Sequence, residues 1–217
     1  MTCASSAMAE TSPARKGWVR RDIVFQSKGV DLHGALFRPA GVDGKLPGIV
    51  ITGPYGSVRE QSPMQYATRL AMAGYACLIF DATGSGASGG ALRRSEGPAQ
   101  RAADIHAATD ALVSDPGTDA ARIGALGICQ GASYMMFAVS ADLRFKALAC
   151  VSGQYLYLHG EQSDGFLIAA RTVYDALTVK DRKLVIEPGI FHTRFYDDPE
   201  IVDGAASEVM DWLGARI

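Results

Sequence analysis

The fold is decided by residues 123–131, whose sequence is IGALGICQG. The apolar run from Ile123 to Gly127 predicts a strand, and the residues that follow Cys129 predict a helix. Cys129 then lies at a sharp strand-to-helix turn, between Gly127 and Gly131, in the arrangement G-x-nucleophile-x-G. Such a turn has strained dihedral angles and needs small neighbours, and a helix N-terminus favours a thiolate over a thiol. We therefore predict that Cys129 is a nucleophile; the plainer alternative is a buried cysteine at a tight turn.

Strands and helices alternate on both sides of this turn. The predicted strands are 19–26 and 30–37, which form a hairpin, then 48–52, 76–80, 123–127, 147–151, 155–159 and 183–186. The predicted helices are 63–73, 98–114, 131–140, 165–177 and 201–213. This alternation is typical of an α/β protein with a mostly parallel sheet covered on both faces by helices. We expect a flexible tail at 1–17 and a single domain at 18–217.

One connection in this alternation is too short. Neighbouring parallel strands need a crossover of about a dozen residues or more. Only Ser152, Gly153 and Gln154 separate two of the predicted strands. Either one of these runs does not belong to the main sheet, or a crossover and cap segment is missing.

The composition is that of an ordinary globular protein. The 217 residues carry a net charge of −2, and 20% of them are charged without a basic stripe, which argues against a nucleic-acid partner. No apolar stretch approaches the roughly 18 residues that cross a bilayer, and residues 1–17 lack the apolar segment of a secretory signal. We expect a cytoplasmic protein without a membrane partner. The four cysteines form no C-x-x-C pair, so no disulfide framework or metal site is predicted, and Cys77 and Cys150 are expected to be small buried hydrophobes.

A thiolate needs a base, and four histidines are available. His192 lies between the last predicted strand and the last predicted helix, where the chain order nucleophile, acid, histidine places the base. His33 in the hairpin is expected to be structural. His106, among alanines on a helix, is expected to be solvated or packed, and His159, beside a glycine, is expected to shape a loop. We predict that His192 is the base.

The remaining parts of such a site would be an acid and two oxyanion donors. Asp164 follows the penultimate predicted strand and is our candidate for orienting the imidazole; Glu161 in the same loop is the alternative. One oxyanion donor would be the backbone N–H of Gln130, which follows the nucleophile. The second would come from the loop at 53–57, where Tyr55 is the candidate because the preceding proline has no N–H; an ordinary turn is an equal alternative there.

The glycine-rich loop at residues 84–90 does not indicate a dinucleotide site. It lacks the G-x-G-x-x-G register directly ahead of a helix, and no acidic residue follows at the end of a second strand. The sequence therefore predicts no nucleotide cofactor.

Three segments resemble the serine- and cysteine-dependent α/β-hydrolases: GYACLIFD at 74–81, G-x-G-x-SGG at 84–90 and RIGALGIC at 122–129. With a cysteine at the turn, the chain is most similar to the dienelactone-hydrolase-related branch. The histidine segment of that branch is similar to residues 183–197, which run from KLVIEPG through His192 to FYD. The resemblance covers about residues 20–217 and implies an α/β-hydrolase fold. The chain departs from the family after Val151, where the short connection predicts a minimal or missing cap.

The resemblance also implies a function. It implies a triad of Cys129, His192 and Asp164 that hydrolyses an ester, lactone or thioester of a small acyl substrate without a cofactor. Related members with this turn act on polyketide-type thioesters, so acyl transfer is an alternative. A non-catalytic binding protein with this fold and a redox-sensing Cys129 thiol are two further alternatives. The oligomeric state stays open, and a homodimer is compatible with the sequence.

Overall fold

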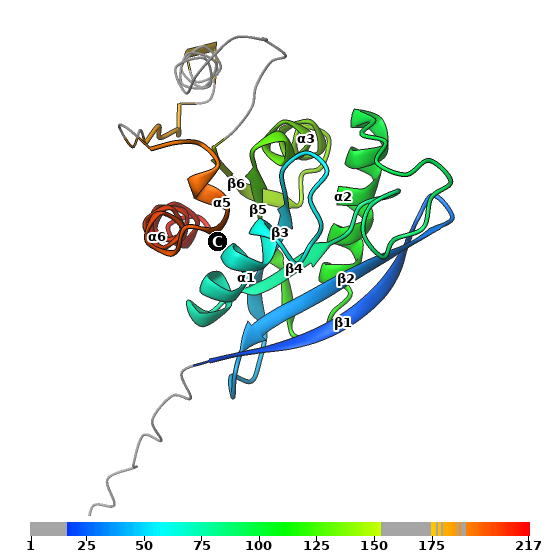
Figure 1. The fold of residues 1–217 in the computed structure, drawn as a ribbon. Coiled ribbons are helices and arrows are strands. Elements are labelled where there is room, and N and C mark those ends of the chain that lie inside the picture. Colours follow the sequence, from blue (N-terminus) through cyan, green and yellow to red (C-terminus); the bar gives the residue numbers. More distant parts are fainter. Residues whose placement is uncertain (1–16, 153–174, 177, 179, 186, 188–189) are drawn as a thin grey trace, which may run out of the picture.

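The computed structural model describes residues 17–152, 175–176, 178, 180–185, 187 and 190–217. Figure 1 shows the arrangement of its elements. The strands are β1 (Trp18–Ser27), β2 (Val30–Pro39), β3 (Leu46–Thr52), β4 (Ala76–Phe80), β5 (Thr118–Ile128) and β6 (Phe145–Val151). The helices are α1 (Ser62–Met72), α2 (Pro98–Val113), α3 (Gln130–Val139), α5 (Arg194–Asp197) and α6 (Pro199–Gly214).

The strands form one sheet in the order β1-β2-β4-β3-β5-β6. β1 and β2 form an antiparallel hairpin, and β2 is antiparallel to β4. The pairs β4–β3, β3–β5 and β5–β6 are parallel. The predicted mostly parallel sheet is therefore confirmed, with the antiparallel hairpin at one edge.

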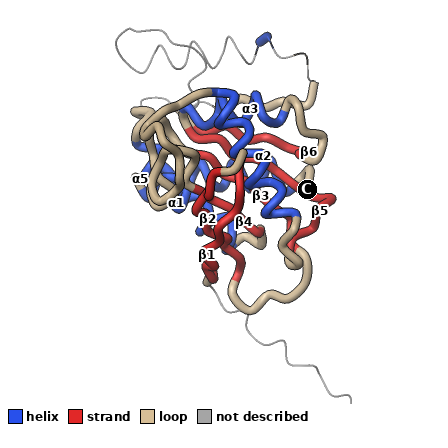
Figure 2. Tube along the Cα trace, turned by 90° about the vertical axis from the view of Figure 1, so that its right-hand side faces the viewer, coloured by secondary structure: helices blue, strands red, loops and turns tan. Residues whose placement is uncertain are grey.

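Helices cover both faces of this sheet (Figure 1, Figure 2). Side chains alternate between the faces along each strand, so Ile49 and Ile51 of β3 enter one core while Val50 enters the other. The first core includes residues of α1 and α6, and the second includes residues of α2 and α3. The buried apolar runs of β3, β4 and β5 thus serve two cores at once, as expected of central parallel strands.

One predicted strand is wrong. Lys183–Val185 form no strand, and the side chain of Val185 is exposed. In the described part of the sheet, β6 is the edge strand, and the indole N–H of Trp212 in α6 donates to the Leu148 carbonyl of β6 at 3.2 Å. A run of only three or four apolar residues carries too little periodicity to separate a strand from an extended loop.

The predicted strand at 155–159 and helix at 165–177 lie largely outside the described residues, as does the short connection between 151 and 155. Among the residues that are described, no helix has the length and apolar character needed to cross a bilayer.

Candidate functional site

Cys129 lies between β5 and α3, at the carboxyl end of the parallel strands. Its φ of 55° and ψ of −121° place a non-glycine residue at positive φ. Such a conformation costs on the order of 1–3 kcal/mol and persists only when the surroundings impose it. The Cys129 N–H donates to the Val151 carbonyl at 2.9 Å, which ties the turn to the end of β6.

The two glycines of the turn are required by close backbone contacts. A Cβ on Gly127 would lie 2.4 Å from the Ala132 Cα, and a Cβ on Gly131 would lie 2.5 Å from the Gly53 carbonyl oxygen. The Thr52 hydroxyl also donates to the Gly131 carbonyl at 3.1 Å. The turn therefore packs directly against the loop that follows β3, as a site that uses backbone N–H groups from both segments would need.

His192 lies next to this turn, just before α5. The Ser152 hydroxyl donates to the His192 carbonyl at 3.0 Å, and Ser152 directly follows the Val151 carbonyl that accepts the Cys129 N–H. Burial lowers the pKa of His192 below its ordinary value of 6.5. The imidazole therefore favours its neutral form, which can accept a proton.

Tyr196 connects His192 to Cys129. Its side chain is hydrogen-bonded to that of Cys129, and its ring meets the His192 ring edge to face, with centroids 5.7 Å apart and planes at 86°. The sequence prediction missed this residue, although the spacing of four between His192 and Tyr196 is the spacing at which two side chains of a helical turn can meet. It missed Ser152 as well, for which the sequence holds no signal.

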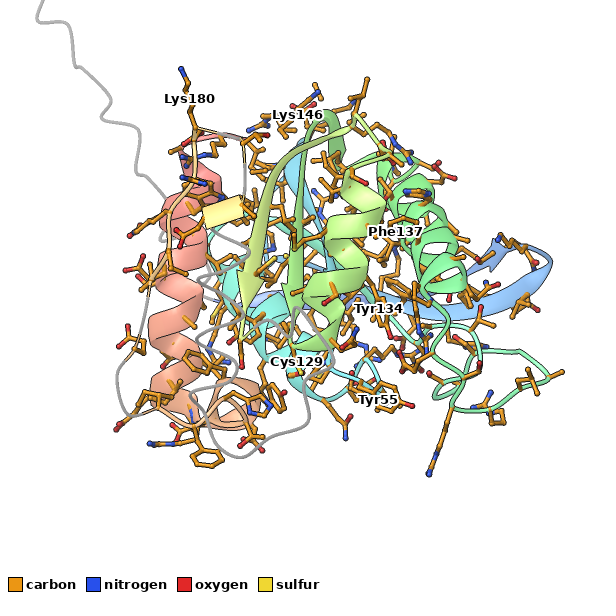
Figure 3. All side chains as sticks on the ribbon, turned by 90° about the horizontal axis from the view of Figure 1, so that it is seen from above. Tyr55, Cys129, Tyr134, Phe137, Lys146 and Lys180 are labelled. Atoms are coloured by element: carbon orange, nitrogen blue, oxygen red, sulfur yellow. The ribbon has the colours of Figure 1, made fainter. Side chains whose placement is uncertain are left out.

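The loop after β3 contains the predicted oxyanion donor Tyr55. Figure 3 shows Tyr55 and Cys129 at the same end of the sheet, and the Tyr55 side chain is 59% exposed. The Ser57 N–H donates to the Pro54 carbonyl at 3.1 Å, which closes a turn. The carboxylate of Glu96 accepts the Gly56 N–H at 2.9 Å and so holds this turn from behind.

Glu96 is itself part of a buried ion pair. It lies 3.0 Å from the Arg101 guanidinium, and the side chains are 8% and 7% exposed. The pair borders a cavity of about 40 Å³ behind the loop, whose described lining does not include Cys129. Ligand pockets usually measure about 300–1,000 Å³, so this cavity is too small for a drug-sized molecule.

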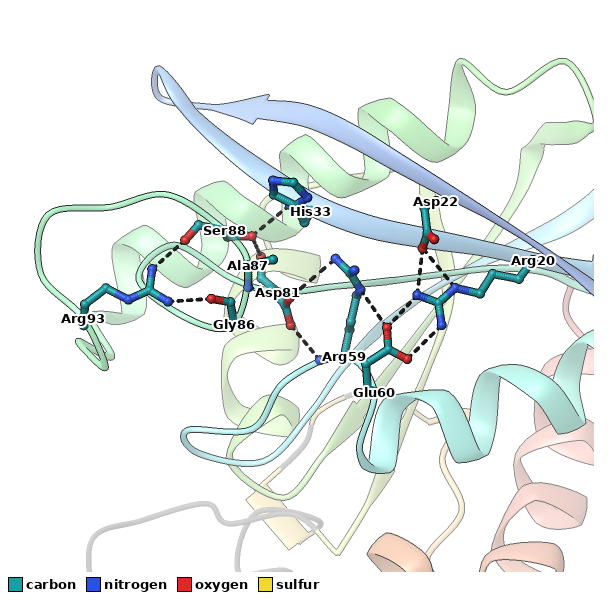
Figure 4. Close-up of polar contacts among 10 residues, drawn as sticks. All are labelled: Arg20, Asp22, His33, Arg59, Glu60, Asp81, Gly86, Ala87, Ser88 and Arg93. Atoms are coloured by element: carbon teal, nitrogen blue, oxygen red, sulfur yellow. Dashed lines mark hydrogen bonds and ion pairs between the residues drawn. The ribbon is translucent and has the colours of Figure 1, made fainter.

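The glycine-rich loop after β4 wraps around the carboxylate of Asp81 (Figure 4). This carboxylate accepts the Ala87 N–H at 3.1 Å and the Arg59 N–H at 2.8 Å, and a Cβ on Gly86 would lie 2.3 Å from it. Here the glycines allow a close approach between backbone and carboxylate. Asp81 thereby fixes this loop and the segment that leads into α1.

Other predicted residues are placed as follows. Gln130 is the first residue of α3, so its N–H belongs to the helix N-terminus. His33 lies in β2, and the ring Nε2 of His106 in α2 is 3.0 Å from the Ala138 carbonyl. Asp164, Glu161 and His159 lie outside the described residues. No group of three His, Cys, Asp or Glu side chains in the described part of the chain is placed to bind a metal ion.

Comparison with known proteins identifies the family. The model of the X-Pro dipeptidyl-peptidase (S15) family matches residues 28–183. The chain belongs to this family. Among its relatives, the uncharacterized protein PA2218 of Pseudomonas aeruginosa is 32% identical to this S15-family chain over 180 residues, which cover 82% of this chain and 46% of PA2218. The uncharacterized protein YcjY of Escherichia coli is 43% identical over 104 residues, 48% of this chain and 34% of YcjY. The S15-family chain thus spans less than half the length of either curated relative.

Solved structures confirm the predicted α/β-hydrolase fold. The crystal structure of PA2218 superposes with a TM-score of 0.64 and 29% identity, covering 81% of this S15-family chain and 58% of the chain in that crystal structure. The dienelactone hydrolase of Anabaena variabilis superposes with a TM-score of 0.75 and 18% identity, covering 93% of this chain and 99% of that one. At 18% identity, the second likeness concerns the fold alone.

Proposed function

We propose that the chain is a cysteine-dependent hydrolase that cleaves an ester, lactone or thioester through an acyl-enzyme on Cys129. One observation carries the proposal: Cys129 is held at positive φ between two glycines at a strand-to-helix turn. A buried cysteine with only a packing role needs no such strain. A nucleophile does, because the turn lifts the side chain out of the backbone and presents it to a substrate.

The first half of the reaction forms the acyl-enzyme. The Sγ–H proton passes to the neutral imidazole of His192, and the sulfur lone pair forms a bond to the carbonyl carbon. The carbonyl π electrons move to the oxygen as a negative charge. When they return, the bond to the leaving alkoxide or thiolate breaks, and the leaving group takes the proton from His192.

The second half hydrolyses the acyl-enzyme. His192 accepts a proton from water, and the hydroxide oxygen bonds to the acyl carbon. The bond from carbon to Sγ then breaks, and His192 returns the proton to Sγ. Asp164, with Glu161 as the alternative, would orient the imidazole and stabilise its charged form. The products are the free acid and the regenerated Cys129–His192 pair.

The oxyanion would be stabilised by two backbone N–H groups, those of Gln130 and Tyr55. Two observations support this assignment: the direct contact between Gly131 and the Gly53 carbonyl, and the bond from Thr52 to Gly131. A single donor of this kind typically lowers the barrier by about 3–4 kcal/mol.

Peptide hydrolysis is the second candidate, and the family description favours it. A cysteine nucleophile argues for oxygen and sulfur esters over amides. The tetrahedral intermediate expels the better leaving group, and an amine leaves far less readily than the Cys129 thiolate unless it is first protonated. Acyl transfer to an acceptor other than water would use the same acyl-enzyme.

A substrate panel tests the proposal. Activated esters, lactones, acyl-thioesters and Xaa-Pro anilides are offered to the wild type, to Cys129→Ala and to Cys129→Ser, with Cys150→Ala in β6 as the matched control. We expect turnover of at least one ester, lactone or thioester, its loss in Cys129→Ala, weak retention in Cys129→Ser and full retention in Cys150→Ala. Turnover by Cys129→Ala equal to that of the wild type would refute the proposal, and cleavage of anilides alone would favour the peptidase.

A further inference from the structure

The short helix α5 is fixed against α1. The Tyr66 hydroxyl of α1 donates to the Phe195 carbonyl at 2.8 Å, and Tyr66 is fully buried. At the start of α5, the Tyr196 N–H donates to the carbonyl of Thr193, the residue before the helix, at 3.0 Å. The peptide group between Phe195 and Tyr196 is therefore held twice, through its carbonyl by buried Tyr66 and through its N–H by the local turn.

From this position the Tyr196 side chain reaches both candidate reacting groups. Its hydroxyl is hydrogen-bonded to the Cys129 side chain, and its ring packs edge to face on the His192 ring. The ring contact restricts rotation of the imidazole, and the hydroxyl can donate to a thiolate.

We propose that Tyr196 is the hydrogen-bond donor that stabilises the Cys129 thiolate, and that its ring at the same time positions the His192 imidazole. This inference rests on the proposed function of Cys129 as a nucleophile. It adds Tyr196 to the pair of Cys129 and His192. Tyr196 belongs to α5, a helix that the sequence did not predict.

The chemistry of a phenol suits this role. Burial, together with the hydrogen bond to Cys129, raises the pKa of Tyr196 above its ordinary value of 10, so the hydroxyl keeps its proton at neutral and mildly alkaline pH. When Sγ bonds to the substrate carbon, the negative charge leaves the sulfur for the carbonyl oxygen. The Tyr196 proton stays on its own oxygen throughout, and only the strength of the hydrogen bond changes.

The apolar core around the thiol contains other phenols and one other thiol. Among the described residues, the titratable side chains of the core around Cys129, with the ring beside them, are Tyr66, Tyr75, Cys77, Tyr196 and His192. The Tyr66 hydroxyl is committed to the Phe195 carbonyl, and burial raises the pKa of the Cys77 thiol.

The test measures the thiol without any substrate. Wild type, Tyr196→Phe and the matched control Tyr75→Phe are alkylated with iodoacetamide from pH 5 to pH 10, and the modification of Cys129 is quantified by peptide mass spectrometry. Tyr75 is buried in the same core, and Tyr75→Phe likewise removes one phenol hydroxyl. Because the assay needs no turnover, a failed proposal for Tyr196 is distinguishable from a failed proposal for the hydrolase.

We expect Tyr196→Phe to raise the thiol pKa by about one unit, as the loss of one charge-assisted hydrogen bond would. At pH values below the thiol pKa, the fraction of Cys129 present as thiolate then falls about tenfold. The intrinsic nucleophilicity of that thiolate rises about threefold, so alkylation slows about three- to fourfold at low pH. Above both pKa values the variant reacts about threefold faster, and the two pH profiles cross. A Tyr196→Phe profile that superimposes on those of wild type and Tyr75→Phe would overturn the proposal, as would a uniform slowing at every pH.

Discussion

Replacing Gly131 by alanine tests the link between the turn and the loop after β3. A Cβ at this position would lie 2.5 Å from the Gly53 carbonyl oxygen and 2.8 Å from that of Thr52. Both obstacles are backbone atoms, which cannot rotate out of the way. To restore an ordinary contact of at least 3.4 Å, the two segments must separate by about 1 Å.

The expected magnitudes follow from this displacement. Overpacking of this kind costs about 1–3 kcal/mol, and the higher helix propensity of alanine offsets up to about 1 kcal/mol of it. We expect a net loss of about 1–2 kcal/mol in the free energy of unfolding. A misplacement of about 1 Å at the site can lower the rate about 100-fold, so kcat/KM should fall by that order.

Urea unfolding and steady-state kinetics on the best panel substrate measure both effects. Gly204→Ala in α6 is the matched control, because a Cβ there meets nothing within 4 Å. It should stabilise the protein by about 0.5–1 kcal/mol and leave kcat/KM unchanged. Wild-type stability together with wild-type kcat/KM in Gly131→Ala would refute the argument that close backbone contact shapes the site.

Three further predictions concern the residues behind the site. Ser152→Ala removes the bond to the His192 carbonyl, and we expect a loss of about 1 kcal/mol in unfolding free energy and a lower kcat, measured by urea unfolding and kinetics. Burial lowers the pKa of His192, so the folded protein disfavours the charged imidazole. The buried neutral ring therefore contributes its full stability above pH 6.5, and this contribution is lost as the pH falls below that value. Wild type should therefore lose more stability than His192→Gln between pH 7 and pH 5, and parallel curves would contradict this. Glu96→Gln removes the closer of the two carboxylates that face buried Arg101 and leaves Asp104 at 3.8 Å, so thermal unfolding should show a loss of about 1.5–3 kcal/mol, against less than about 1 kcal/mol for exposed Glu60→Gln.

The central part of the fold was predictable because local signals coincide there. The apolar run before Cys129 fixes β5, the two glycines fix the turn, and residue 130 starts a helix in the structure as predicted to within one position. The hairpin β1–β2 was predictable for a similar reason, since a glycine sits between two extended runs. In each case the residues that specify an element are neighbours in the sequence.

Contacts between distant segments could not be predicted. The hydrogen bond of Tyr196 to Cys129 depends on how α5 docks against α1, and no local pattern encodes that docking. Ser152 has a φ of 49° directly after β6, a conformation that its residue type does not predict. The apolar residues 184–186 matched a strand in sequence, yet Leu184 and Val185 lie outside any strand, since strand formation depends on a neighbouring partner.

The most direct test of the central claim is the mass of the enzyme during reaction. Wild type is mixed with a stoichiometric amount of an activated ester, quenched in acid within seconds, and analysed by intact mass and by peptide mapping. We predict a single added acyl group on the peptide that contains Cys129, and none in Cys129→Ala. No adduct on the wild type under conditions of measurable turnover, or an adduct that persists in Cys129→Ala, would contradict it.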